Sequence, residues 1–159
     1  MRKTVGIIGV LLLALPLWAH PNYAQLRAKA ARAHGHKRAE LLSRLAFMDF
    51  LFAEQSFEAG QSLPGHRSLG RLERDGTESV QLLRAEAARG KKSGMRNVEI
   101  QFQKIAYGLG RLRREANFRD QPAIGAARRD FSRWRRLLLA WMFARKKNGH
   151  LVLGPDQGQ

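Results

Sequence analysis

Residues 124–141, "IGAARRDFSRWRRLLLAW", decide the fold class of this chain. Their apolar side chains recur at alternating steps of three and four residues, which is the period of one face of an α-helix. That face consists of Ile124, Ala127, Phe131, Trp134, Leu138 and Trp141. A seven-residue repeat of this kind predicts a narrow apolar seam that packs against parallel or antiparallel helices.

Helical periodicity continues upstream of this stretch. The segment just before it carries a second seam, made of Val98, Phe102, Ile105, Leu109, Leu112 and Ala116. An earlier helix is predicted from Tyr23 to Glu58, and Gly35 is a point at which it bends or begins. The seam of this earlier helix is Leu41, Leu45, Met48 and Phe52.

One more helix is predicted from Gly76 to Arg89. Its inward-facing positions are Val80, Leu83 and Ala87. Asp75 and Glu78 have the spacing of a capping box, in which the two side chains satisfy free amides of a first helical turn. The Gly-, Pro- and Ser-rich residues 59–70, "AGQSLPGHRSLG", are accordingly interpreted as a loop.

Short connections join the later helices. Residues 90–94, "GKKSG", form a tight connection, and Pro122 suits the first turn of the last helix, with Asp120 or Gln121 as its cap. The last helix is expected to continue to Lys147, where "NG" stops it. Because short connections favour antiparallel neighbours, the expected fold is all-α, an antiparallel up-down-up-down four-helix bundle.

The first 24 residues have the composition of an export signal. Arg2 and Lys3 precede the apolar stretch Val5 to Trp18, which has the length of a secretory core and is shorter than the roughly 20 residues of a membrane span. Small residues suited to cleavage are Ala19 and Ala24, and we favour Ala24. The competing interpretation is an uncleaved membrane anchor.

The expected organisation has three parts. Residues 1–24 are a signal peptide or anchor, residues 25–148 form a single helical domain, and residues 149–159 form a flexible tail. This organisation predicts a periplasmic or secreted protein, or a membrane-anchored one if the first segment is retained.

The composition is strongly basic and lacks cysteine. Lysine and arginine total 29 against 13 acidic residues, which gives a formal charge of +16, and arginine outnumbers lysine 21 to 8. Such a charge attracts anionic partners, and guanidinium groups bind phosphate or carboxylate in bidentate fashion. The absence of cysteine excludes disulfides, thiolate metal sites and covalently attached c-type haem.

Basic residues concentrate towards the end of the chain. From Arg111 to Lys147 there are 12 basic and 3 acidic residues, a net charge of +9. On a helix, Arg129, Arg133 and Arg136 fall within about 60° of one another, opposite the apolar seam. The full candidate anion-binding set is Arg128, Arg129, Arg133, Arg135 and Arg136, extended from the preceding helix by Arg111, Arg114 and Arg119.

These features predict an exported, non-enzymatic helical-bundle protein that binds an anionic envelope component or an acidic protein partner. The candidate partners are lipid headgroups, lipopolysaccharide, acidic polymers and acidic proteins, with nucleic acid as a further anionic candidate. The apolar seams also leave room for a homo-oligomer, because a seam can pair between chains as well as within one.

The alternative is a periplasmic helical bundle that holds a metal or non-covalent haem for sensing, storage or electron transfer. His36 and Glu40 stand one helical turn apart and could share a metal ion. Haem would require a histidine together with a methionine such as Met48 or Met95. The sequence contains neither the His-Glu-x-x-His motif of zinc proteases nor the Glu-x-x-His pairs of di-iron bundles, so no cofactor is expected.

Overall fold

The computed structural model describes residues 21–144, 146–147 and 150–151. This part of the chain contains helices α1 (Pro21–Arg32), α2 (Gly35–Glu58), α3 (Ser62–Ala88), α4 (Met95–Glu115) and α5 (Gln121–Phe143). The two-residue strands β1 (Lys146–Lys147) and β2 (His150–Leu151) pair antiparallel. The predicted all-α class is confirmed. Most of the predicted signal segment and of the predicted tail lies outside the described residues.

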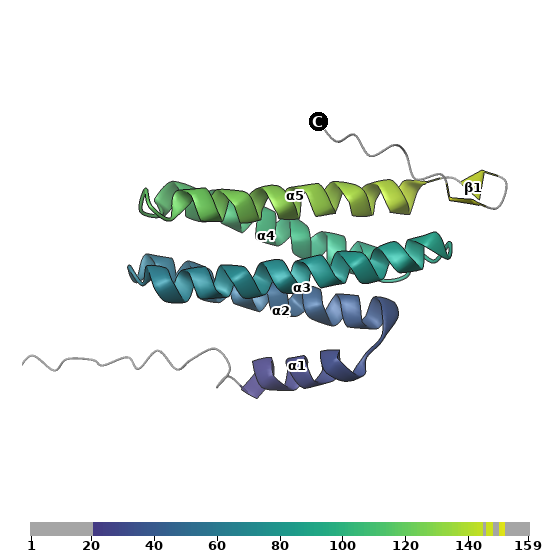
Figure 1. The fold of residues 1–159 in the computed structure, drawn as a ribbon, viewed down its shortest axis with the longest axis horizontal. Coiled ribbons are helices and arrows are strands. Elements are labelled where there is room, and N and C mark those ends of the chain that lie inside the picture. Colours follow the sequence, from purple (N-terminus) through teal and green to yellow (C-terminus); the bar gives the residue numbers. More distant parts are fainter. Residues whose placement is uncertain (1–20, 145, 148–149, 152–159) are drawn as a thin grey trace, which may run out of the picture.

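Helices α2 to α5 lie around one core, and the chain reverses direction from each helix to the next (Figure 1). The most extensive pairings are α2 with α3 and α4 with α5, and α2 also contacts α4 while α3 contacts α5. Consecutive helices α3 and α4 therefore lie diagonally across the core. The predicted packing of consecutive helices against each other is thus seen for α2–α3 and α4–α5, whereas α3 and α4 make no extensive contact. The connection at residues 90–94 therefore crosses the end of the core, from α3 to the diagonally opposite helix α4.

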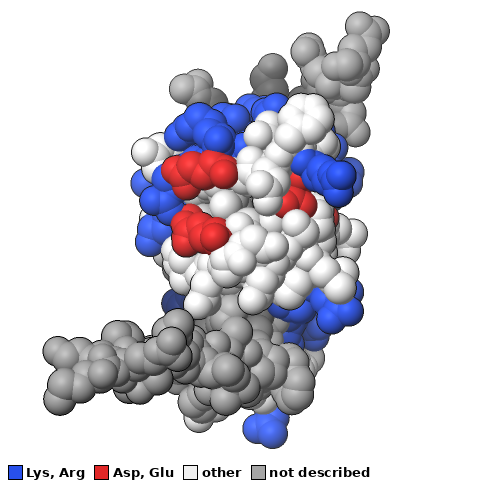
Figure 2. All heavy atoms as spheres, turned by 90° about the vertical axis from the view of Figure 1, so that its left-hand side faces the viewer, with Lys and Arg blue, Asp and Glu red and all other residues white. Residues whose placement is uncertain are grey.

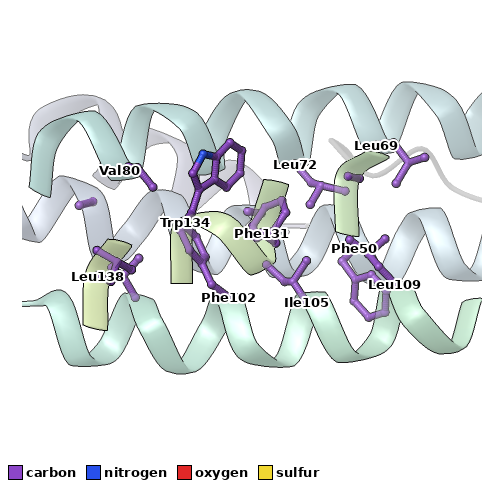
Figure 3. Close-up of a cluster of buried hydrophobic side chains, with 14 of the residues drawn as sticks. Phe50, Leu69, Leu72, Val80, Phe102, Ile105, Leu109, Phe131, Trp134 and Leu138 are labelled. Atoms are coloured by element: carbon purple, nitrogen blue, oxygen red, sulfur yellow. The ribbon is translucent and has the colours of Figure 1, made fainter. Parts of the chain in front are cut away.

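An aromatic cluster from α4 and α5 fills the centre of the core (Figure 3). The rings of Phe102 and Phe131 meet edge to face with centroids 4.9 Å apart, and the centroids of Phe131 and Trp134 are 4.8 Å apart. Both predicted seams face this core: all six α5 positions are buried, as are five of the six α4 positions, with Ala116 partly buried. The seven-residue repeats thus identified the contact faces correctly.

The first predicted helix is two helices. The helix is interrupted between α1 and α2, where Gly35 adopts a positive φ of 55°. The predicted seam of α2 packs mainly against α1, in a second apolar cluster that includes Tyr23 and Leu45. The face of α2 that enters the main core is richer in alanine: Ala39, Ala46, Phe50, Ala53 and Phe57.

Helix α3 begins at Ser62, so the interpretation of residues 59–70 as a loop is wrong. The turn consists of residues 59–61, in which Gly60 has φ 71°. Pro64 lies in the first turn of α3, where backbone amides have no helical partner and a proline costs little. Asp75 is buried in the middle of α3, so the predicted capping box is also wrong.

Helix α5 ends at Phe143 rather than at Lys147, and Pro122 lies in its first turn as predicted. Nζ of Lys92, in the α3–α4 connection, donates to the carbonyl oxygens of Met142 at 2.6 Å and Ala144 at 3.0 Å. It thereby satisfies acceptors at the negative end of the helix. Across the described part of the chain, every helix is too short or too polar to cross a membrane.

Candidate anion-binding site

A hollow of about 520 Å³ lies on the surface of the α4–α5 pair. We call it the arginine pocket. It is lined by Arg113, Gly125, Arg128, Arg129, Asp130, Ser132, Arg133 and Arg136. Seen from the end of the molecule, basic side chains gather at the top of the view, over these two helices (Figure 2). The lining contributes five guanidinium groups and a single carboxylate, so the pocket is strongly cationic.

Two glycines leave room for arginine side chains at the contact between α4 and α5: Arg128 of α5 lies against Gly110, and Arg113 of α4 lies against Gly125. A Cβ atom added to Gly110 of α4 would lie 3.2 Å from Nε of Arg128, and one added to Gly125 of α5 would lie 3.3 Å from Nε of Arg113. Side chains at these positions would push both arginines outwards. The missing side chains at Gly110 and Gly125 therefore leave room for these two arginines and help to set the shape of the pocket.

Charge within the pocket is only partly compensated. Asp130 is the one carboxylate in the lining, and its Oδ1 lies 3.0 Å from Nη2 of Arg133. The other four lining arginines therefore contribute an excess of positive charge. Guanidinium groups are planar and weakly hydrated, and they bind phosphate or carboxylate through paired hydrogen bonds. The arrangement is suited to an anion that presents several oxygens.

The structure brings four of the eight predicted arginines into the pocket. They are Arg128, Arg129, Arg133 and Arg136. Arg114 and Arg119 are exposed but do not line it. Sequence reasoning missed Arg113, which enters the pocket from α4. Helical periodicity orients residues on one helix, but it does not set the register between two helices. The local signal for Arg113 was the pair of glycines at positions 110 and 125, which lie against the pocket arginines.

The remaining two predicted arginines hold the fold together. Nε of Arg135 donates to Oε1 of Glu99 at 2.7 Å, and the Glu99 side chain is completely buried. Arg111 forms an ion pair with Glu54, which joins α4 to α2. We therefore remove Arg135 and Arg111 from the candidate binding set, since each already has a carboxylate partner within the protein.

A buried polar cluster, which we call the α1 clamp, joins α1 to α2 and α3. Asp49 is fully buried and accepts hydrogen bonds from Nε of Arg71 at 2.7 Å and from the Tyr23 hydroxyl at 3.1 Å. Arg27 of α1 donates to the Tyr23 oxygen at 2.7 Å and to Oδ1 of Asp75 at 2.8 Å. Burial raises the pKa of both carboxyls above the ordinary aspartate value, and the arginine hydrogen bonds oppose this shift.

The predicted metal ligands lie at the contact between α2 and the start of α4. Oε1 of Glu40 accepts a hydrogen bond from Nδ2 of Asn97 at 2.9 Å, and His36 packs near Gly94. Among the described residues, no three histidine or acidic side chains gather as metal ligands would. Of the methionines considered for haem, Met95 is completely buried in the core. His36 and Glu40 thus both lie beside Gly94, and Glu40 has a polar partner in Asn97.

Comparison with family models, curated proteins and solved structures finds no match for this chain. Its function is therefore inferred from the charge, geometry and packing of its own residues. Within the described part of the chain, the arginine pocket offers the most distinctive chemistry.

Proposed function

We propose that this is an exported, non-enzymatic protein whose arginine pocket binds an anionic component of the cell envelope or an acidic protein partner. The observation that carries the proposal is the pocket itself, with five guanidinium groups and one carboxylate around about 520 Å³. Like charges that line one pocket repel one another, and a bound anion offsets that repulsion. Helices α4 and α5 pack against each other and into the core, so the backbone positions of the arginines are fixed before an anion binds.

Export is part of the same proposal. The basic and apolar residues at the start of the chain have the pattern of a signal peptide, which supports a periplasmic or secreted location. The position of α1 supports the other of the two candidate cleavage positions. Cleavage after Ala24 would cut through α1 and remove Tyr23, whereas cleavage after Ala19 would leave all of α1 attached. We propose that the mature protein begins at His20.

We also propose that α2 to α5 are a four-helix bundle of up-down-up-down order, to which α1 adds a fifth helix. The alternating chain direction and the short connections at residues 59–61 and 116–120 support this description. Its distinctive feature is the diagonal step from α3 to α4, which leaves α3 beside α5. An experimental structure of the exported protein would test the arrangement.

A pair of matched triple variants tests the proposed binding. One carries Arg129→Glu, Arg133→Glu and Arg136→Glu in the pocket. The control carries Arg67→Glu, Arg74→Glu and Arg84→Glu at exposed positions of α3, which changes the net charge by the same amount. Affinity for long-chain inorganic polyphosphate, measured by titration calorimetry, is expected to fall at least roughly tenfold in the pocket variant and far less in the control.

Salt dependence adds a second readout to this experiment. The unmodified protein should bind polyphosphate less tightly as salt rises, and the pocket variant should show a shallower dependence because fewer phosphate contacts release counterions. Equal losses of affinity in the two triple variants would show that only the net charge matters, and the proposed site would then be wrong.

A further inference from the structure

The solvent-facing side of α5 changes from basic to apolar along its length. Its last two turns expose apolar side chains: Leu137 is 36% exposed, Phe143 is 78% exposed, and Ala140 is exposed between them. We call these three residues the apolar end of α5. Phe143 is one of the most exposed large apolar side chains in the described part of the chain. Exposed apolar side chains that adjoin one another are unfavourable in water, and they mark a candidate contact surface.

The apolar end adjoins the arginine pocket on the same helix face. Leu137 follows Arg133 by four residues, and Ala140 follows Arg136 by four, so each apolar residue is the next neighbour of a pocket arginine along the helix surface. Phe143 lies roughly 10 Å beyond Arg136 along the helix axis. Cationic and apolar surfaces therefore form one continuous strip.

The end of this strip is held in place. Lys92 donates to the carbonyl oxygens of Met142 and Ala144, on either side of Phe143. On the opposite face of the same turns, Leu138 and Trp141 are buried in the core. Phe143 is therefore presented outwards by a helix end that is tied to the rest of the molecule.

We propose that this strip docks on the surface of an anionic phospholipid bilayer. The inference rests on the proposed function, because it uses the same arginine pocket. The guanidinium groups would contact headgroup phosphates, while Leu137 and Phe143 would enter the boundary between headgroups and acyl chains. Amphipathic helices bind membranes in this way, through apolar burial combined with attraction to anionic lipids. A water-soluble polyanion would engage the arginines but would leave the apolar end exposed.

Vesicle binding of the full processed chain tests the inference. The test variant carries Leu137→Ser and Phe143→Ser. Its matched control carries Tyr107→Ser and Phe118→Ser, which remove two other strongly exposed aromatic rings. In co-sedimentation with vesicles of phosphatidylcholine and phosphatidylglycerol, the test variant should bind roughly tenfold more weakly than the unmodified protein, and the control should bind like it. Both variants should keep their affinity for polyphosphate.

A fluorescence measurement tests the same docking with a variant that keeps an aromatic side chain at position 143. Phe143→Trp introduces an exposed indole, whereas Trp134 and Trp141 are buried. Its emission should shift to shorter wavelength and be quenched by brominated acyl chains when anionic vesicles are added. An emission spectrum that does not change, with vesicles that do bind, would overturn the proposed orientation.

The outcomes separate this inference from the proposed function. If polyphosphate binding depends on the pocket arginines but anionic vesicles bind no better than vesicles of phosphatidylcholine alone, the docking inference is wrong and the proposed function stands. If the test variant loses polyphosphate affinity as well, the apolar end is not a separate lipid contact. If sedimentation shows that the test variant dissociates an oligomer while vesicle binding stays unchanged, the apolar end is a contact between copies of the chain.

Discussion

Asp49 and Asp75 are buried carboxyl groups that depend on partners far away in the sequence. Arg27 reaches Asp75 across a separation of 48 residues, and Arg71 reaches Asp49 across 22. No local pattern links such pairs, which is why Asp75 was interpreted as a capping residue from its spacing to Glu78. Local motifs describe neighbours along the chain, and these aspartates are instead defined by tertiary contacts.

The Arg71–Asp49 pair yields a prediction about stability. Arg71→Ala would leave the fully buried Asp49 without its closest cation, so the free energy of unfolding should fall by about 3 kcal/mol. Urea denaturation followed by circular dichroism at neutral pH measures this change. The control is Arg74→Ala, an exposed position on the same helix, which should change stability by less than about 0.5 kcal/mol. Equal effects of the two substitutions would contradict the role of the pair.

Burial of Asp49 also predicts the direction of a pH dependence. Because burial raises its pKa in the folded state, the folded protein binds a proton at pH values where the unfolded chain is still ionised. The contribution of Asp49 to stability should therefore increase as pH falls from 7 towards about 4. Urea midpoints should show the unmodified protein gaining stability relative to Asp49→Asn over this range. A constant difference between the two proteins, or a relative loss, would be inconsistent with the raised pKa.

Among the elements, α4 and α5 were predictable and the first half of α3 was not, for a physical reason. The seams of α4 and α5 use large side chains such as Phe102 and Trp134 at regular spacing, so periodicity alone identifies the buried face. The first half of α3 contains Pro64 and several glycines, which normally indicate a loop. Pro64 is tolerated in a first turn, and Gly65 is required because a Cβ there would lie 2.7 Å from the ring of Phe57.

Glycines inside helices provide a sharp test of the packing between elements. A Cβ atom on Gly108 of α4 would lie 2.3 Å from Cζ of the buried Phe50, whereas one on Gly70 of α3 would have no heavy atom within 4 Å. Gly108→Ala should therefore destabilise the protein by about 2 kcal/mol through overpacking. Gly70→Ala should stabilise it by up to about 1 kcal/mol through helix propensity alone. Two changes of the same sign in thermal unfolding would refute the close approach of α2 and α4.

The position of α1 predicts the processed N-terminus. Tyr23 and Arg27 are both in the α1 clamp, so a chain that begins at Gln25 would lose the hydrogen bond from Tyr23 to Asp49. We expect cleavage after Ala19, and intact mass spectrometry of the exported protein reads this directly. A measured mass that corresponds to a chain beginning at Gln25 would show that the clamp does not require Tyr23.

At the scale of the whole molecule, the sequence located the cationic region better than it identified the residues that line the pocket. Charge counting located the cationic region in α4 and α5, and it correctly placed Arg129, Arg133 and Arg136 on one face. It could not distinguish Arg135, which pairs with the buried Glu99, from arginines that face the pocket. That distinction depends on how the helices pack, and packing also brings Arg113 into the site.

The most direct test of the central claim is a titration of the arginine-labelled protein with inorganic pyrophosphate, followed by NMR of the side-chain Nε–H groups. We predict chemical-shift changes concentrated at the pocket residues Arg113, Arg128, Arg129, Arg133 and Arg136, with little change at the exposed Arg67, Arg74 and Arg84 of α3. Equal shifts across both groups, or none in the pocket, would contradict binding at the arginine pocket.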